Sequence, residues 1–159
     1  MATPGNIFAR QRLTAGQMRA VAERRFDDAQ ALCDTGQNAR ANGVQYLAGI
    51  AVEILLKAQL MERYPVEARL RSHELTDASR PVWSLIWRSH DLEEMLDHLP
   101  QLGAGVRKQG ERAGLPYWKW LSSICGSWTI YARYSTLSTT MSSAREMLDR
   151  VRQLKEVLK

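Results

Sequence analysis

Two oppositely charged residues lie in the most apolar stretch of the sequence. Glu53 and Lys57 are four residues apart within residues 44–61, and Tyr46 falls on the same helical stripe. A charge buried in such a helix needs a partner, and Glu before Lys at this spacing is the favourable order for a local ion pair. The pair has a second interpretation, in which Glu53 orients Lys57 or Arg133 towards a phosphate group.

Arg133 precedes a segment that is rich in hydroxyl groups. Ser and Thr dominate residues 135–143, directly before a stretch with helical periodicity. A guanidinium group, hydroxyls and the free amides of a helix start can together hold an anion, although helix capping and a solvated loop explain the same residues. The sequence thus predicts a phosphate or nucleotide site formed by Glu53, Lys57, Arg133, Tyr134 and Ser135.

A second group of basic residues is interleaved with aromatic ones. Tyr117, Trp118 and Trp120 follow a Gly-containing stretch, and this composition suits phosphate contact and base stacking. A solvated loop that leads into an aromatic core helix is the alternative. The predicted nucleic-acid-binding residues are Arg107, Lys108, Arg112 and Lys119.

Three potential metal ligands recur at four-residue steps. His90, Glu94 and His98 share one helical face, but the rise of a helix separates the two histidines by about 12 Å, too far for one ion. We therefore predict no metal site and expect His90 to cap a helix. The sequence contains no Gly-rich phosphate loop and no recognisable nucleophile motif, so we predict no cofactor and no catalytic residue.

The composition is that of an ordinary globular domain. The 159 residues are 45% hydrophobic and 25% charged, with a formal net charge of +5 that permits an anionic partner. The two cysteines, Cys33 and Cys125, are far apart and form no metal-binding pair, which favours a reducing cytoplasm. No run of eighteen uninterrupted apolar residues is present, so we expect no membrane span.

Hydrophobic periodicity predicts helices and no strand. Thr14 and Gln17 have capping-box spacing and begin a helix that Gly36 ends, and a helix that is apolar on nearly all sides follows over residues 38–64. Residues 1–12 are expected to form a flexible arm. Residues 65–88 are expected to form an uneven connection with one short helical turn at residues 83–87.

The second half of the chain shows three more helical stretches. We expect one to begin at Ser89 or His90 and to end at Pro100, and another to cover residues 116–134, with a flexible basic loop between them. Ser143 and Glu146 have capping-box spacing before the last helix. The predicted fold is all-α, a single domain over residues 13–159 with four to five helices.

Three segments, in their order and spacing, resemble the HEPN family (higher eukaryotes and prokaryotes nucleotide-binding domain). They are residues 46–58 (YLAGIAVEILLKA), Ser89-His90-Asp91-Leu92, and Ala132-Arg133-Tyr134 before the final helix. The resemblance implies an up-and-down bundle and a homodimer. It also implies a metal-independent ribonuclease, a nucleotide-binding domain, or a partner module of nucleotidyltransferases and defence systems.

The ribonucleases of this family carry an Arg followed by four to six residues and then a His. None of the three histidines in this chain has an Arg at that distance before it. We therefore expect a non-catalytic HEPN-like module, in a defence or toxin–antitoxin type system, that binds a nucleotide, RNA or a protein partner. The alternatives are a divergent HEPN ribonuclease and a structural helper subunit of a nucleotidyltransferase or effector. The ribonuclease would use Arg133, Arg69 or Arg71 with His73 or His90.

Overall fold

The described residues form an all-α fold, as predicted. The structure is a computed structural model, which describes residues 13–64, 76–77 and 79–159, and no strand occurs among them. The helices are α1 (Ala15–Asp34), α2 (Ala41–Arg63), α3 (Arg80–Trp87), α4 (Leu92–Asp97), α5 (Pro100–Ala113), α6 (Tyr117–Ser127) and α7 (Met141–Val157), with the 3₁₀ turns η1 (Asn38–Arg40) and η3 (Ile130–Tyr134). The predicted arm and residues 65–75 and 78 of the predicted connection lie outside the described residues.

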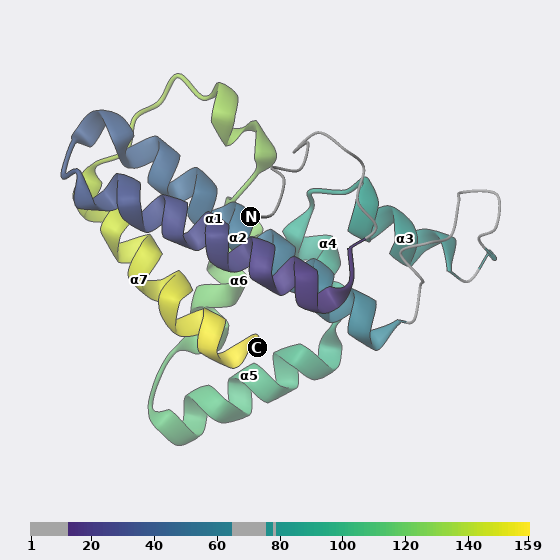
Figure 1. The fold of residues 1–159 in the computed structure, drawn as a ribbon. Coiled ribbons are helices and arrows are strands. Elements are labelled where there is room, and N and C mark those ends of the chain that lie inside the picture. Colours follow the sequence, from purple (N-terminus) through teal and green to yellow (C-terminus); the bar gives the residue numbers. More distant parts are fainter. Residues whose placement is uncertain (1–12, 65–75, 78) are drawn as a thin grey trace, which may run out of the picture.

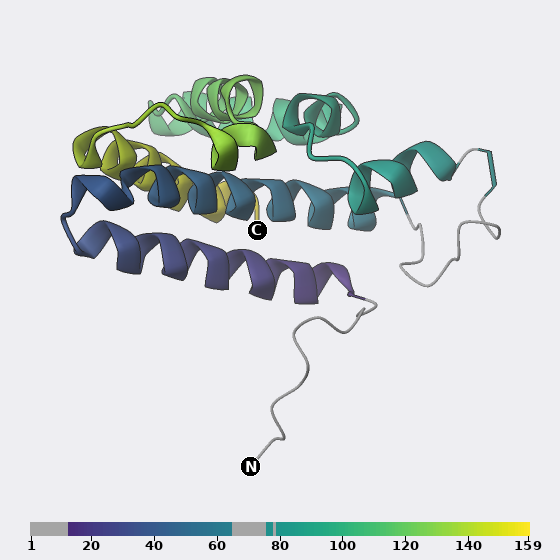
Figure 2. The same cartoon turned by 90° about the horizontal axis from the view of Figure 1, so that it is seen from above.

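Helix α2 lies in the middle of the molecule. Helix α1 packs along one side of it, α7 runs beside it, and η3 with α4 to α6 covers the opposite side (Figures 1 and 2). Side chains of all seven α-helices join one hydrophobic core. Twelve of the 23 residues of α2 are buried, which agrees with the prediction of a helix that is apolar on nearly all sides.

Helix α1 begins and ends where the sequence predicts. The hydroxyl of Thr14 accepts a hydrogen bond from the amide of Gln17, and the Gln17 side chain accepts one from the amide of Thr14, so the capping box is confirmed. Gly36 follows the helix with φ of 66°, a conformation that favours glycine.

Polar contacts fix the helices α1, α2 and α7 relative to one another. Arg19 of α1 donates to Glu62 of α2 at 2.8 Å and to the carbonyl oxygen of Leu158, just after α7, at 2.6 Å. The buried Lys155 of α7 pairs with Glu23 of α1, and its Nζ lies 3.8 Å from the centre of the Phe26 ring. These three helices therefore form one tightly connected unit.

The predicted basic loop is a helix, α5, and this expectation was wrong. Pro100 stands in the first turn, where its missing N–H costs nothing, so it begins α5 instead of ending the helix before it. The glycines allow close packing: a Cβ on Gly103 would lie 2.8 Å from the Trp118 ring, and one on Gly110 would lie 2.5 Å from the Leu115 carbonyl oxygen. Gly114, with φ of 65°, ends the helix.

Three other predicted boundaries were wrong. The helix predicted for residues 116–134 stops at Ser127, because Trp128 is extended and η3 follows. Asp91, and not Ser89 or His90, caps α4 by accepting from the amide of Glu94 at 2.9 Å. Thr140, and not Ser143, caps α7 by accepting from the amide of Ser143 at 3.2 Å. With α3 and α5 added, the described residues form seven α-helices, more than the four or five expected.

The stretch Asn38–Arg63 has the length and composition of a membrane-spanning helix, with a mean hydropathy of 1.3 over its most apolar part. However, 61% of that part is buried inside the fold. The apolar character of α2 is thus used in packing against α1, α7 and the helices on the opposite side.

The position of the α7 cap can be tested with two neighbouring variants. We expect Thr140→Ala to lower the free energy of unfolding by about 1 kcal/mol, because the amide of Ser143 loses its acceptor. Ser143→Ala should cost roughly 0.5 kcal/mol or less, as expected for an exposed site. Urea unfolding of both variants measures the difference, and equal losses would contradict Thr140 as the cap.

Candidate functional site

A buried carboxylate on α2 forms the centre of the candidate site. Glu53, on α2, is 4% exposed, and its Oε1 lies 2.6 Å from Nζ of the equally buried Lys57. The same oxygen lies 3.0 Å from Nδ1 of His90, which comes from the connection between α3 and α4. The local ion pair expected from the spacing is therefore present, and His90 completes it from a distant segment.

The geometry sets the proton on the His90 ring. An ionised carboxylate only accepts hydrogen bonds, so Nδ1 carries the proton that it donates to Glu53, and in the neutral ring Nε2 has the free lone pair. The His90 side chain is 48% exposed and lines a cavity of about 470 Å³ together with Arg88 and Tyr131. The expectation that His90 caps a helix was wrong, since its ring is used in binding Glu53.

Trp128 packs directly on the backbone of α2, one turn before Glu53. A Cβ atom on Gly49 would overlap the five-membered part of the Trp128 indole, so this approach requires glycine. The Trp128 ring also stacks on Tyr46, with 6.0 Å between the ring centres. Trp128 Nε1 and Glu53 Oε2 are both buried and have no hydrogen-bond partner among the described residues.

Residues 128–140, here called the arch, connect α6 to α7 and contain η3 (Figure 1). Trp128 fixes the start of the arch on α2. Asn42 fixes its end, since its side chain donates to the carbonyl oxygen of Leu137 at 2.7 Å and accepts from the amide of Thr139 at 2.9 Å. Asn38 accepts from the amide of Met141, the first residue of α7, at 2.9 Å.

The predicted phosphate-binding residues lie at two levels of the structure. Glu53 and Lys57 are buried in α2, whereas Arg133, Tyr134 and Ser135 are exposed on the arch. The Arg133 guanidinium lies 4.7 Å from the centre of the Tyr134 ring, and the Ser135 hydroxyl accepts from the amide of Leu137. Among the described residues, no hydrogen bond or ion pair joins the buried pair to the three arch residues.

The arch also displays large apolar side chains. Among the described residues, four large hydrophobic side chains are exposed, and three of them belong to the arch: Tyr131 at 71%, Tyr134 at 69% and Leu137 at 79%. Arg133 lies between the two tyrosines in the sequence. Exposed Tyr with Arg is a composition typical of protein interfaces.

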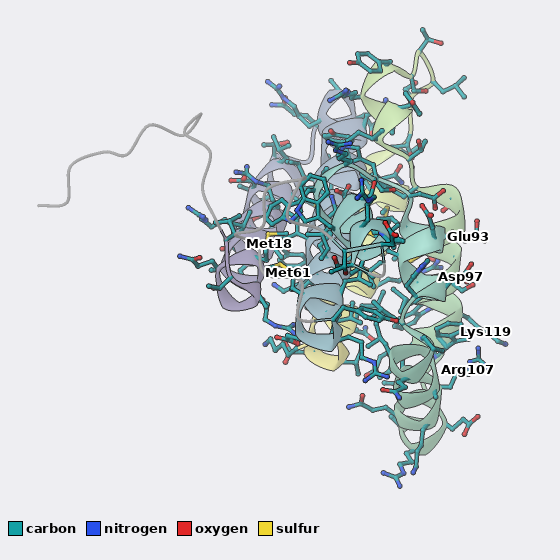
Figure 3. All side chains as sticks on the ribbon, turned by 90° about the vertical axis from the view of Figure 1, so that its right-hand side faces the viewer. Met18, Met61, Glu93, Asp97, Arg107 and Lys119 are labelled. Atoms are coloured by element: carbon teal, nitrogen blue, oxygen red, sulfur yellow. The ribbon has the colours of Figure 1, made fainter. Side chains whose placement is uncertain are left out.

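The predicted nucleic-acid-binding residues lie on two helices that follow one another in the chain. Arg107, Lys108 and Arg112 lie on α5 and Lys119 on α6, and all four are exposed. None of the four forms an ion pair with another described residue. Arg107 and Lys119 point outward on the same side of the molecule, bordered by Glu93 and Asp97 of α4 (Figure 3). We call the four cations the basic surface.

Packing orients one of these cations. The Arg107 guanidinium lies 4.3 Å from the centre of the Trp118 ring, which in turn packs against Gly103 of α5. Because Arg107 lies over the Trp118 ring, that face of the ring is not free to stack on a base. The role of Trp118 is to hold Arg107 in place at the edge of a cavity of about 440 Å³ that Lys119 also lines.

Cys125, on α6, is not an activated nucleophile. Burial, reinforced by the carboxylates of Glu93 and Asp91, raises the pKa of its thiol to about 12. The thiol is therefore protonated near neutral pH, where only a thiolate would react rapidly.

Two features of this region were not predicted from the sequence. The Glu53–His90 contact joins residues 37 apart, and the arch is held by Asn42 across a separation of 95 residues. The only sequence signal for the first was a histidine without a predicted partner inside a HEPN-like segment. Gly49, a glycine inside an otherwise strong helix, could have indicated the close approach of Trp128.

The contribution of the buried pair of Glu53 and Lys57 to stability can be tested. We expect Lys57→Met to lower the free energy of unfolding by about 3–5 kcal/mol, because it leaves the Glu53 carboxylate buried without its nearest cation. The double variant Glu53→Leu, Lys57→Met removes both charges and should recover much of this loss. Thermal and urea unfolding measure both variants, and a double variant less stable than Lys57→Met would contradict the prediction.

Comparison with known proteins gives no relative. No protein-family model matches the sequence, and no curated protein and no solved structure is significantly similar to it. The function of the chain is therefore inferred from its own residues and geometry.

Proposed function

We propose that this chain is a non-catalytic HEPN-like module that binds RNA over the basic surface. The observation that carries the proposal is the concentration of charge on α5 and at the start of α6. Residues 100–119 contain four cations and a single acid, Glu111, and the cations form no ion pairs with other described residues. Cations of this kind attract phosphates without first breaking an internal salt bridge.

The position of Arg107 supports phosphate binding in particular. Trp118 holds its guanidinium at the surface, so less side-chain freedom is lost when a phosphate binds. A guanidinium group can also form two parallel hydrogen bonds to one phosphate. Contacts of this type read the backbone and not the bases, so we expect weak dependence on RNA sequence.

Two further observations support a HEPN-like module without catalysis. Residues of two HEPN-like segments, Glu53 with Lys57 and then His90, meet inside the fold, and the arch that carries the third segment is anchored one turn away at Gly49. The spacing of Arg and His that marks the family's ribonucleases is absent from the sequence.

RNA binding can be measured with a short single-stranded RNA by fluorescence anisotropy. We expect the variant Arg107→Gln, Lys108→Gln, Arg112→Gln, Lys119→Gln to lose most of the affinity, because four phosphate contacts are removed. If all four cations contact phosphates, the slope of the logarithm of the association constant against the logarithm of the salt concentration should become less negative by about 3 in this variant. The matched control, Arg24→Gln, Arg40→Gln, Arg63→Gln, Arg145→Gln, removes the same charge from exposed positions elsewhere. Equal losses in both variants would contradict a specific basic surface.

A divergent HEPN ribonuclease is the second candidate, and the Glu53–His90 contact favours it. A buried carboxylate orients the imidazole, and the Nε2 lone pair can accept a proton from a bound hydroxyl group. Arg69, Arg71 and His73, the other residues considered for catalysis, lie outside the described residues. The same RNA, incubated with the protein in chelator, should stay intact, whereas cleavage that disappears in His90→Ala would favour the enzyme.

We also propose that two copies of the chain form a homodimer in the cytoplasm. The two copies would contact each other through the arch, where Tyr131, Tyr134 and Leu137 are exposed. We expect light scattering to give twice the 18.1 kDa mass of one chain. Tyr134→Ser, Leu137→Ser should return the mass to one chain, because it removes apolar area from the contact. Leu115→Ser is the control, because Leu115 is the other exposed large hydrophobic residue in the described part of the chain.

A dimer that survives in the arch variant would contradict this interface. The exposed arch residues would then be proposed to bind a different protein, and a nucleotidyltransferase or an effector is the candidate class of partner.

A further inference from the structure

A cavity of about 400 Å³ lies beneath the arch and shares Trp128 and Thr129 with the cavity that His90 lines. Its walls come from the first turns of α2, the end of α6, the inner side of the arch and Met147 of α7. The cavity is separate from the basic surface on α5 and α6.

The lining is polar but uncharged. None of the described lining residues carries a formal charge, and most of them bear a side-chain amide or hydroxyl group. Asn42, Gln45 and Ser138 are examples, while Tyr46 and Trp128 provide an aromatic wall. Phosphates and ammonium groups would lose their hydration here without gaining an opposite charge, so the lining disfavours charged ligands.

The hydrogen-bonding capacity of the lining is only partly used inside the protein. The Gln45 amide group donates to Ser143 at 3.3 Å, but its carbonyl oxygen accepts from no described group, and the Tyr46 hydroxyl has no described partner. Both side chains project from α2, which is held in the core. Two acceptors or donors on a rigid helix are therefore available to a ligand.

The arch is fixed before any ligand binds. Trp128 at one end and the hydrogen bonds of Asn42 at the other tie it to α2, so the walls belong to elements whose relative positions are already set. A cavity whose walls are preorganised loses little conformational entropy on binding. Its volume lies within the range of about 300–1,000 Å³ that is usual for small-molecule sites.

We propose that the cavity beneath the arch binds an uncharged ring compound with several hydroxyl groups. One face of the ring would lie on the aromatic wall, and its hydroxyls would reach Gln45, Tyr46 and Ser138. A nucleoside and a free monosaccharide share this chemistry. The proposal does not depend on RNA binding at the basic surface.

Isothermal titration calorimetry with four probes tests the proposal: adenosine, uridine, D-glucose and inorganic phosphate. We expect at least one of the three uncharged probes to bind and phosphate not to bind at the same site. Adenosine or uridine without glucose identifies a nucleoside, and glucose without either identifies a saccharide. Both results support the proposal. Binding of none of the three, or competition of the bound probe by phosphate, would overturn it.

Variants locate the bound probe. Gln45→Leu and Tyr46→Phe each remove one hydrogen-bonding group and keep the size of the side chain, so each should weaken binding roughly 2- to 10-fold. Thr136→Val, on the arch but outside the lining, is the matched control and should bind as the wild type does. The variant of the basic surface should also bind the probe normally, which separates this proposal from RNA binding. Equal affinities in Gln45→Leu, Tyr46→Phe and the control would place the ligand elsewhere.

Discussion

Glu53 brings a negative charge into the centre of the helix around which the molecule is built, and two neighbouring groups bind one oxygen of its carboxylate. Lys57 supplies the opposite charge from the next turn of α2, and His90 adds a hydrogen bond from the connection between α3 and α4. A buried carboxylate without such partners would be costly. The position of the α3–α4 connection against α2 is thus set by charge as well as by apolar packing.

The same face of α2 determines where the arch begins. Gly49 lies one helical turn before Glu53, and the indole of Trp128 occupies the space that any larger residue would take. Trp128 lines both cavities, of about 400 Å³ and 470 Å³. The candidate sites around the arch therefore depend on one close contact between a ring and a helix backbone.

Features that depend on residues close together in the sequence were predicted correctly, whereas features that depend on distant residues were not. The capping box at Thr14, the helix around Glu53 and the pair of Glu53 with Lys57 depend on residues within one turn of each other, and the sequence predicted all three. Helix α5 was missed because its glycines and Pro100 appear unfavourable locally. In the fold, Gly103 leaves room for the ring of Trp118, and Pro100 is tolerated because it stands in the first turn of the helix.

Long-range contacts define the rest of the candidate site, and no local pattern encodes them. The contact of His90 with Glu53 and the anchoring of the arch by Asn38 and Asn42 become visible only in three dimensions. The predicted nucleic-acid residues could be grouped from the sequence because they lie close together along the chain. The exposed and buried members of the predicted phosphate site could not be separated in this way, since exposure depends on packing.

The hydrogen bonds of Asn42 have a consequence for the order in which the molecule folds. They join positions 95 and 97 residues apart, whereas α1 and α2 are separated by a short connection. Closing a long loop costs more entropy than closing a short one, so we expect the helical hairpin of α1 and α2 to form before Asn42 binds the arch.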